Sequence, residues 1–512
     1  MSSYPDFDRF RLRRLVERLV DAGQCEVRED PVDMIDVAGA LDGNARAVWF
    51  RNLQPEGSEL VCNVMGSRER IALALGTTPE RLTDVVRDRL GRPFAPIEVP
   101  AGDAPVQQVV EVGDEADLTR LPIHLQHGLD GAPYISASLD FTVDPQTGWT
   151  NVGARRMMLR GRREAGVDLN APSDLRAIYQ AAVARGEPLP VAYVVGLHTA
   201  DYLASVAATP AMDELSVMGA LRGASVPVVK CVTNDIRVPA DAELVIEGYL
   251  DPRGLCEPEG PYGEYIGYYG VLKRNPVFHV TAITRRHDAL FQTATIGGRS
   301  LARTDTAQLC AVKTEAALWS VLQHAVREPR QVYCTPSCGG MYNARIAMRQ
   351  RYPGEARNAI AAVFCSTADV KHVFVVDDDI DVFSDEQVDW ALATRFQADR
   401  DLVVGSGFRA VPLDPSLQGA REGGKAGFDL TKPFGRADGI EFVVPMPPTY
   451  TARPVQDLRE ALEGGARTFL ELMELRGTRD GRDLVRELEQ LYSAGVLERD
   501  PDGKYQIRKE TT

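Results

Sequence analysis

Two glutamates stand close together in the segment EPEGPYGEYIGYY, which covers residues 257–269. Glu259 and Glu264 are five residues apart across a Gly-Pro-Tyr-Gly turn, and tyrosines surround them. Two carboxyl groups in one confined pocket need not share a protonation state, because burial favours the neutral form and a neighbouring cation favours the ionised form. The pair could act in general acid catalysis, although an exposed acidic turn would have the same sequence.

Further polar residues lie upstream in segments that otherwise predict strands. The stretch WTNVGARRMM contains Asn151 and Arg156, and the apolar run ELVIEGYL contains Glu247. A carboxylate inside an apolar strand needs a partner, either a cation or a metal. Asn151 and Glu247 together would give two oxygen ligands suited to Mn²⁺ or Mg²⁺ with a bound phosphate.

Two other motifs offer alternative chemistry. Asp377, Asp378 and Asp379 follow an apolar strand in VVDDDID, where a nucleotide-sugar glycosyltransferase would hold a divalent cation. The simpler interpretation is a solvated acidic cluster before a helix that Ser384 caps. His124 and His127, in HLQH, have no third metal ligand nearby in the sequence, which disfavours a zinc site.

Composition excludes several classes of protein. The 512 residues include 58 basic and 73 acidic side chains, a net charge of −15 without a basic stripe, which disfavours nucleic-acid binding. No apolar run approaches the roughly 20 residues of a membrane-spanning helix. The first residues show no apolar signal core, and the eight cysteines are scattered, so we expect a soluble cytoplasmic protein with free thiols.

Periodicity predicts four regions that must position these residues. Residues 1–105 mix helices and short strands, and residues 106–320 contain many extended β-branched runs, typical of a barrel-like domain. Residues 321–450 return to strand–helix alternation. Residues 451–512 are charged and helical and end in a hairpin, so they predict either a small winged-helix shape or a dimerisation arm.

Several segments together resemble the UbiD family of decarboxylases, which use prenylated FMN. They are ALGTTPERL, LPIHLQHGLDGAPYISASL, PEGPYGEYIGYY and KHVFVVDDDIDVF, and the resemblance extends from about residue 10 to residue 445. It implies an α/β fold with an N-terminal α/β domain, a central split β-barrel that binds the flavin, and a C-terminal α/β domain that dimerises. It also implies that VVDDDID is a structural feature of the family.

The resemblance assigns roles residue by residue. The catalytic Arg and the paired glutamates match Arg156, Glu259 and Glu264, and the metal-binding Asn and Glu match Asn151 and Glu247. Similar proteins hold Mn²⁺ and K⁺ beside the flavin phosphate. The residues expected to contact the cofactor are Trp149, Asn151, Ala207, Ala208, Thr209 and Glu247.

One departure affects the metal site. The family places a metal-binding His before a helix, but here the stretch is NAPSDLRAIY, without His. Asp174 could supply an oxygen in its place, yet Asp is also a natural N-cap, and we favour the cap.

The implied reaction is reversible, non-oxidative decarboxylation of an aromatic or heteroaromatic α,β-unsaturated acid. Arg156 would orient the substrate carboxylate and hold Glu259, while Glu264 would deliver the replacement proton. The tyrosines near these acids favour a planar substrate. A flavin prenyltransferase would supply the cofactor, and we expect a homodimer or a higher homo-oligomer.

Overall fold

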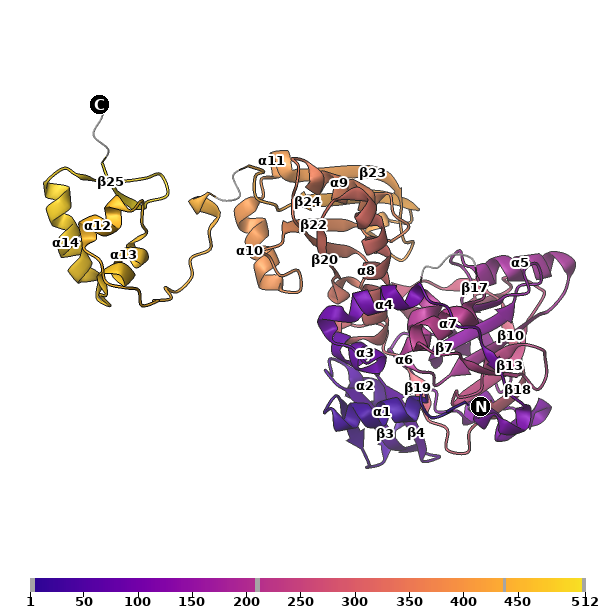
Figure 1. The fold of residues 1–512 in the computed structure, drawn as a ribbon. Coiled ribbons are helices and arrows are strands. Elements are labelled where there is room, and N and C mark those ends of the chain that lie inside the picture. Colours follow the sequence, from indigo (N-terminus) through magenta and orange to yellow (C-terminus); the bar gives the residue numbers. More distant parts are fainter. Residues whose placement is uncertain (1–4, 208–211, 436–438, 509–512) are drawn as a thin grey trace. The chain divides into compact units, whose positions relative to one another are not determined.

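The computed structural model describes residues 5–207, 212–435 and 439–508. It divides into two compact units, Met1–Thr431 and Lys432–Thr512, which are described separately (Figure 1). The predicted boundaries at residues 105, 320 and 450 stay predictions.

The first part of unit 1 is a five-stranded sheet covered by helices. Buried residues Leu12, Leu15, Val16 and Leu19 recur at helical spacing on α1, so one face of this helix packs against the core. Strand β19 comes from much later in the chain and pairs in parallel with β4, which joins this sheet to the central region. The elements are α1 (Leu12–Asp21), β1 (Cys25–Arg28), β2 (Val32–Asp33), α2 (Val37–Leu41), β3 (Ala47–Gln54), β4 (Ser58–Cys62), α3 (Arg68–Leu75), α4 (Leu82–Leu90) and β19 (Phe291–Thr293).

The central region contains a closed barrel of six antiparallel strands, which confirms the predicted barrel. Strand order is β13-β10-β7-β8-β9-β18, and a β13–β18 pairing closes the ring. Strand β6 pairs with β18 outside this ring. The elements are β6 (Val109–Val112), β7 (Tyr134–Val143), β8 (Thr150–Leu159), β9 (Glu164–Val167), α5 (Asp174–Arg185), β10 (Leu189–Val195), α6 (Thr199–Val206), α7 (Glu214–Arg222), β13 (Leu244–Leu250) and β18 (Val277–Arg285).

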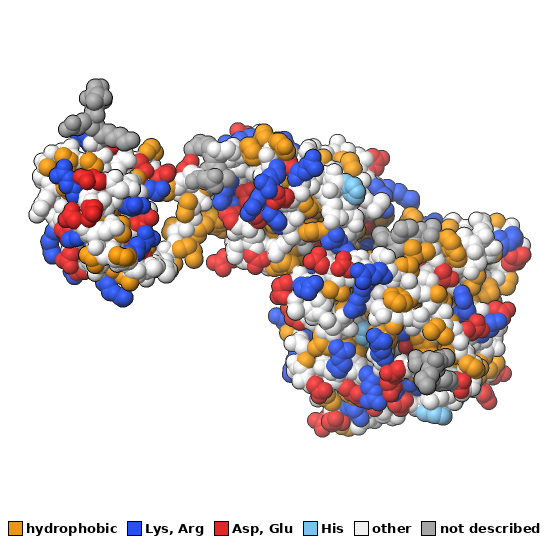
Figure 2. Space-filling model, viewed as in Figure 1, with side chains coloured by type: hydrophobic (Ala, Val, Ile, Leu, Met, Phe, Trp, Pro, Cys, Tyr) orange, Lys and Arg blue, Asp and Glu red, His pale blue; other side chains and the backbone are white. Residues whose placement is uncertain are grey.

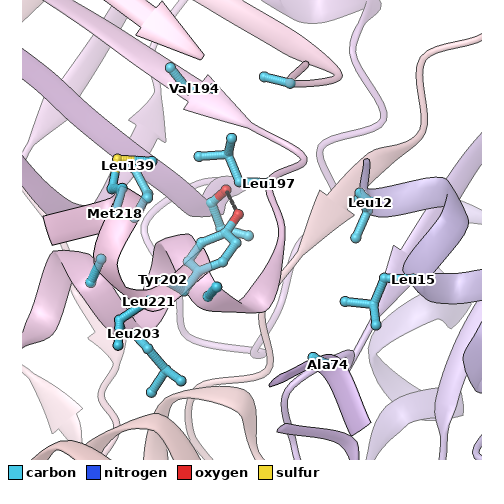
Figure 3. Close-up of a cluster of buried hydrophobic side chains, with 14 of the residues drawn as sticks. Leu12, Leu15, Ala74, Leu139, Val194, Leu197, Tyr202, Leu203, Met218 and Leu221 are labelled. Atoms are coloured by element: carbon cyan, nitrogen blue, oxygen red, sulfur yellow. Dashed lines mark hydrogen bonds between the residues drawn. The ribbon is translucent and has the colours of Figure 1, made fainter. Parts of the chain in front are cut away.

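Alternating residues of the barrel strands enter two different cores. On β10, Val191, Tyr193 and Val195 belong to one hydrophobic cluster, while Ala192 and Val194 belong to another. This two-residue period is the geometry of a strand buried on both faces. Figure 3 shows the second cluster, in which Leu139 and Val194 lie near side chains of α6 and α7, among them Tyr202, Leu203, Met218 and Leu221.

The last part of unit 1 is a five-stranded sheet in the order β20-β21-β22-β24-β23. Helices α8 and α9 contribute to one hydrophobic cluster with this sheet, and α10 to a separate one, so helices cover both faces. The predicted cap is confirmed, because the Ser384 hydroxyl accepts a hydrogen bond from the Gln387 amide at the start of α10. The elements are α8 (Asp305–Ala325), β20 (Pro329–Cys334), β21 (Asn343–Met348), α9 (Glu355–Phe364), β22 (His372–Asp377), α10 (Asp385–Arg395), α11 (Ala398–Asp401), β23 (Leu402–Arg409) and β24 (Glu422–Asp429).

The acidic cluster after β22 faces arginines. Arg395 makes ion pairs with Asp377 at 3.5 Å and with Asp379 at 2.9 Å, and Arg349 pairs with Asp378 at 3.0 Å. These carboxylates are neutralised by guanidinium groups of the same domain. The glycosyltransferase alternative built on Asp377–Asp379 is therefore not favoured.

Unit 2 has its own small hydrophobic core. It consists of α12 (Leu458–Glu463), α13 (Phe469–Arg476), α14 (Gly481–Ser493), β25 (Leu497–Arg499) and β26 (Tyr505–Ile507), and a bridge joins Arg467 to Tyr505. A capping box between Thr468 and Glu471 begins α13. The predicted order of helices followed by a hairpin is present, while the winged-helix shape and the dimerisation arm both stay predictions.

Two further observations concern the length of the helices and the charge of the surface. Among the described residues no helix is long and apolar enough to cross a membrane. On the face drawn in Figure 2, basic and acidic side chains are intermixed over both units.

Candidate active site

Arg156, on barrel strand β8, contacts three carboxylates at once. Its Nη1 lies 3.0 Å and 3.1 Å from the two Glu264 oxygens, and its Nη2 lies 2.9 Å from Asp168 Oδ2. Its Nε lies 3.4 Å from Glu259 Oε1. The structure therefore brings together the Arg156–Glu259–Glu264 set expected from the sequence.

Two short hairpins position the glutamates. Glu259 ends β14 (Glu257–Glu259), which pairs with β17 (Lys273–Asn275), while Glu264 follows β15 (Tyr262–Gly263), which pairs with β16 (Tyr269–Gly270). Gly260, between them, has φ +97°, a conformation that disfavours every residue with a side chain. A Cβ at Gly270 would lie 2.7 Å from Glu264 Oε1, so only glycine leaves room for this carboxylate.

The two glutamates have different neighbours. Glu259 is fully buried and accepts hydrogen bonds from the Tyr134 hydroxyl at 2.9 Å and from Asn275 Nδ2 at 3.1 Å. Glu264 faces cations instead, and burial, together with the nearby charges of Asp168 and Glu259, raises its pKa although Arg156 and Lys273 oppose that rise. The expected pairing of Glu259 with Arg156 is present at 3.4 Å, and Glu264 lies closer to the same guanidinium group, at 3.0 Å.

A second cation completes the cluster. Lys273 Nζ lies 3.0 Å from Asp168 Oδ2 and 3.8 Å from Glu264 Oε1. Burial opposes ionisation of Asp168, but Arg156 and Lys273 outweigh it and hold its pKa below the usual range. With every group charged, two cations would face three carboxylates. One bound proton would balance these charges, and burial favours the protonated form of Glu264.

A cavity of about 360 Å³ contains Trp149, Asn151, Asp174 and Glu214 among its lining residues. Asn151 Nδ2 donates to Glu214 Oε2 at 3.1 Å. Burial raises the pKa of Glu214 to about 7, with the nearby charges of Asp140, Asp174 and Asp213 adding to the effect. A partly buried carboxyl with this affinity for a proton, beside an amide and other acids, also suits a hard cation. No group of three or more His, Cys, Asp or Glu side chains forms a preassembled metal site within the described residues.

Glu247 does not join Asn151, contrary to the pairing we expected. Its two carboxylate oxygens accept from the backbone amides of Val232 and Thr233 at 2.9 Å and 2.8 Å, and from the Thr233 hydroxyl at 2.8 Å. Its strand, β13, is three strands away from β8 in either direction around the barrel. Glu247 therefore fastens the turn between β11 (Pro227–Lys230) and β12 (Arg237–Pro239) to the barrel.

The remaining predicted cofactor residues have mixed outcomes. Ser173, rather than Asp174, is the N-cap of α5, because its hydroxyl accepts from the Arg176 amide. Asp174 is the first helical residue and is exposed. Ala207 is the C-cap that follows α6, whereas Ala208 and Thr209 lie outside the described residues.

The tyrosines do not form the stacking surface that we expected. The Tyr262 ring is buried and already packs against the Arg156 guanidinium, with a distance of 4.6 Å to the ring centroid. Tyr268 and Tyr269 are 65% and 41% exposed. The tyrosines therefore give no support to a planar substrate, and an aromatic acid stays a prediction.

Sequence reasoning missed several residues of the site. Asp168 and Lys273 occupy segments without a motif, and only the strand pairing brings them to Arg156. Asn275 was missed for the same reason, whereas Tyr134 lies within the quoted segment LPIHLQHGLDGAPYISASL but was not assigned a role. Glu214 had a weak signal, since it follows Asp213 at the start of a helix, where acids are common.

Three family models match most of the chain. The N-terminal, Rift-related and C-terminal domains of 3-octaprenyl-4-hydroxybenzoate carboxy-lyase, named UbiD_N, UbiD and UbiD_C, match residues 16–90, 97–300 and 307–430. Together they include every residue of the cluster around Arg156.

Individual relatives agree with these models. Anhydromevalonate phosphate decarboxylase of Methanosarcina mazei is 31% identical over 432 residues, which are 84% of this chain and 98% of that protein. The UbiD-class enzyme HmfF from Pelotomaculum thermopropionicum in complex with FMN has a TM-score of 0.81 and 33% identity, covering 85% of this chain and 97% of HmfF. An evolved dimeric HmfF in complex with prFMN has a TM-score of 0.76 and 32% identity, covering 83% and 95%. The chain therefore belongs to the UbiD family of carboxy-lyases, as its motifs predicted.

Proposed function

We propose that this protein uses prenylated FMN to decarboxylate an α,β-unsaturated carboxylic acid without net oxidation. The observation that carries the proposal is the buried cluster in which Arg156 faces Glu259, Glu264 and Asp168. Such a cluster can hold an anionic substrate and also deliver a proton. The structural similarity to HmfF in complex with FMN and with prFMN supports the choice of cofactor.

The cavity beside Asn151 suits the phosphate end of the flavin, provided that a cation also binds in the cavity. Asp144, Asp174 and Glu214 line this cavity with a single arginine, Arg185, so a bare phosphate would meet net negative charge. Mn²⁺ or Mg²⁺ held by Asn151 and Glu214, with Asp174 nearby, would reverse that balance. K⁺ is a further proposed ion, and Trp149 would contact the cofactor.

The protein's own residues supply position and a proton. Prenylated FMN, when bound, supplies the electron sink for breaking the carbon–carbon bond to the carboxylate. Arg156 orients the substrate carboxylate, and CO₂ leaves with the electron pair remaining on the substrate. Glu264 donates its proton to the carbon that lost CO₂, and the resulting carboxylate is stabilised by Arg156 and Lys273. Tyr134 and Asn275 hold Glu259 against Arg156.

Two substrate classes follow from different observations. An aromatic or heteroaromatic acid is the class predicted from the sequence. A phosphate-bearing unsaturated aliphatic acid is the second, because the relative from Methanosarcina mazei is an anhydromevalonate phosphate decarboxylase. A screen must therefore include both classes.

The test is production of the protein together with a flavin prenyltransferase, the proposed supplier of the cofactor. The purified protein should show a flavin absorbance spectrum, contain Mn²⁺, and release CO₂ from at least one unsaturated acid. Protein produced without the prenyltransferase should bind FMN but release no CO₂. Equal CO₂ release from both preparations, or no flavin in either, would overturn the proposal.

We further propose a homodimer formed through residues 321–450. Val404, on the edge strand β23, is 70% exposed, and Trp390 on α10 is 41% exposed, so this region presents apolar side chains to solvent. Sedimentation velocity of the wild type beside Val404→Glu tests the assignment. The variant should sediment as a monomer, whereas an unchanged dimer would place the interface elsewhere.

A further inference from the structure

Each turnover of the proposed reaction consumes one proton at a buried carboxyl. Glu264 gives its proton to the carbon that has lost CO₂, so this carboxyl must gain another proton before the next substrate reacts. Only 2% of the residue is exposed. With so little surface in contact with solvent, Glu264 depends on its neighbours for the supply of that proton.

Of the charged groups that the described part of the chain places beside Glu264, one can pass a proton on. Arg156 lies closest, at 3.0 Å, but a guanidinium group does not lose its proton in a protein. Asp168 has a pKa held below the usual range, so it stays ionised, and Glu259 is fully buried. The remaining group is Lys273, whose Nζ lies 3.8 Å from Glu264 Oε1. An ammonium group can give up a proton and take one back.

Lys273 lies between the buried carboxyl and the surface. It is the first residue of β17, where it pairs with Glu259 of β14, and 18% of its side chain is exposed. The residues on either side of it, Leu272 and Arg274, are both exposed. Because the four-carbon stem of lysine is flexible, Nζ can contact solvent at one end of its movement and Glu264 at the other.

Asp168 holds the ammonium group of Lys273 near Glu264. Its Oδ2 accepts a hydrogen bond from Lys273 Nζ at 3.0 Å and another from Arg156 Nη2 at 2.9 Å. This double contact fixes the carboxylate, which in turn fixes the lysine. A small rotation of the lysine side chain, or one bridging water, would span the 3.8 Å that separate its Nζ from Glu264.

Transfer of a proton from an ammonium group to a carboxylate is fast enough for an enzyme. For the isolated side-chain types the transfer is uphill by about six pKa units, which slows it about 10⁶-fold from a ceiling of about 6 × 10¹² s⁻¹. The remaining rate still exceeds a typical kcat of about 1–10³ s⁻¹. Burial raises the pKa of Glu264, which narrows the gap further.

We infer that Lys273 is a proton relay that reprotonates Glu264 after each turnover. The ammonium group of Lys273 transfers one N–H proton to the Glu264 carboxylate, which becomes the neutral acid again. The neutral amine then takes a proton from a hydronium ion or a buffer acid at the surface, so each cycle moves one proton from solvent to product. The inference rests on the proposed function and adds the path by which its proton enters.

Substitutions separate the relay from the charge of Lys273. Lys273→Arg keeps a cation beside Glu264 but cannot release its proton, and Lys273→Ala removes both properties. Each variant should lower kcat at least about tenfold, with KM little changed. Methylammonium should restore part of kcat in Lys273→Ala, whereas tetramethylammonium, which has the charge but no N–H, should not. The control is Arg274→Ala, which removes an exposed cation from the same strand.

The first turnover distinguishes a relay from a structural role. A resting enzyme has had time to protonate Glu264 from solvent. Rapid-quench measurement of product should therefore show a first turnover of Lys273→Ala within about threefold of the wild-type rate, followed by slow later turnovers. A first turnover as slow as the later ones, a wild-type kcat in Lys273→Arg, or equal rescue by the two ammonium ions would overturn the inference.

A pH jump supplies a readout without turnover. Infrared difference spectra of the cofactor-loaded protein, with Glu264→Gln as the reference, isolate the carboxylic acid band of Glu264. After a jump to lower pH, this band should appear at least about tenfold more slowly in Lys273→Ala than in the wild type or in Arg274→Ala. Equal rates would contradict the relay. If the wild type turns over no acid, the proposed function fails, and the pH jump still decides whether Lys273 carries protons to Glu264.

Discussion

Glu259 and Glu264 contact the same guanidinium group, but they have different neighbours. Glu259 receives hydrogen bonds from Tyr134 and Asn275. Glu264 faces Arg156 and Lys273, while burial raises its pKa. A carboxyl whose pKa is raised stays protonated to a higher pH and can then act as a general acid, so the two glutamates should separate in a partial reaction.

We predict this separation in proton exchange of the product. Both Glu264→Gln and Glu259→Gln should reduce decarboxylation by at least about 10²-fold. Exchange of the product proton in deuterated buffer needs the acid but no loss of CO₂. Glu264→Gln should abolish that exchange, and Glu259→Gln should retain part of it, as measured by NMR. Glu257→Gln, a partly exposed glutamate on the same strand, is the control. Exchange at the wild-type rate in Glu264→Gln would assign the proton to another residue.

Lys273 should set the pH range of the reaction. Its charge lowers the pKa of Glu264, although burial keeps that pKa above the ordinary value of a glutamate. Decarboxylation needs protonated Glu264, so the rate falls as pH rises through this pKa. Removing the charge in Lys273→Met should move the alkaline limb of kcat upward by about one pH unit, while Lys273→Arg should restore it. A limb that moves downward would show that Lys273 does not act on Glu264.

The residues of the site were predictable to the extent that they belong to a motif. The spacing of Glu259 and Glu264 drew attention to that pair, and the resemblance to the family assigned Arg156 its role beside them. Asp168 and Lys273 reach the cluster only through the pairing of strands, which local sequence does not encode. The pairing of Glu259 with Arg156 was predicted and is present, but the hydrogen bond that Glu259 accepts from Tyr134 could not be foreseen.

At the scale of elements, strands were easier to predict than their order. Extended β-branched runs predicted the barrel, and the structure closes it with β13 against β18. The predicted Asn151–Glu247 pair needed the two strands to be neighbours, but half the barrel separates them. Glu247, the carboxylate inside an apolar strand, has hydrogen-bond partners. They are backbone amides of a turn, and not the cation or metal that we expected.

We predict opposite effects on stability and on metal content for substitutions of Glu247 and Glu214. Glu247→Ala leaves two amides and a hydroxyl without their acceptor, so it should lower the free energy of unfolding by about 2–5 kcal/mol. The folded variant should keep its Mn²⁺ and flavin. Glu214→Gln removes a charge beside Asn151 and should lower the Mn²⁺ and flavin content with little loss of stability. Metal analysis, flavin absorbance and chemical denaturation compare the two variants. Loss of Mn²⁺ in folded Glu247→Ala would restore our first assignment.

At the scale of the whole molecule, the chain joins a carboxy-lyase to a unit that the family models do not match. The matched residues end at 430, and unit 1 ends at Thr431. All residues of the Arg156 cluster belong to unit 1. The core of unit 2 is formed by its own leucines, including Leu472, Leu484 and Leu488. Each unit is therefore stabilised by its own hydrophobic core.

We predict that a chain ending at Thr431 keeps its catalytic function. Because no cluster residue and none of the core of unit 1 is removed, kcat/KM should stay within about threefold of the full-length value, with an unchanged flavin spectrum. Sedimentation velocity of the same truncated protein separates the two interpretations of residues 451–512. A dimerisation arm predicts a shift from dimer to monomer on truncation, whereas a winged helix that serves another purpose predicts an unchanged assembly. Loss of flavin binding on truncation would instead show that unit 2 stabilises the catalytic unit, despite their separate cores.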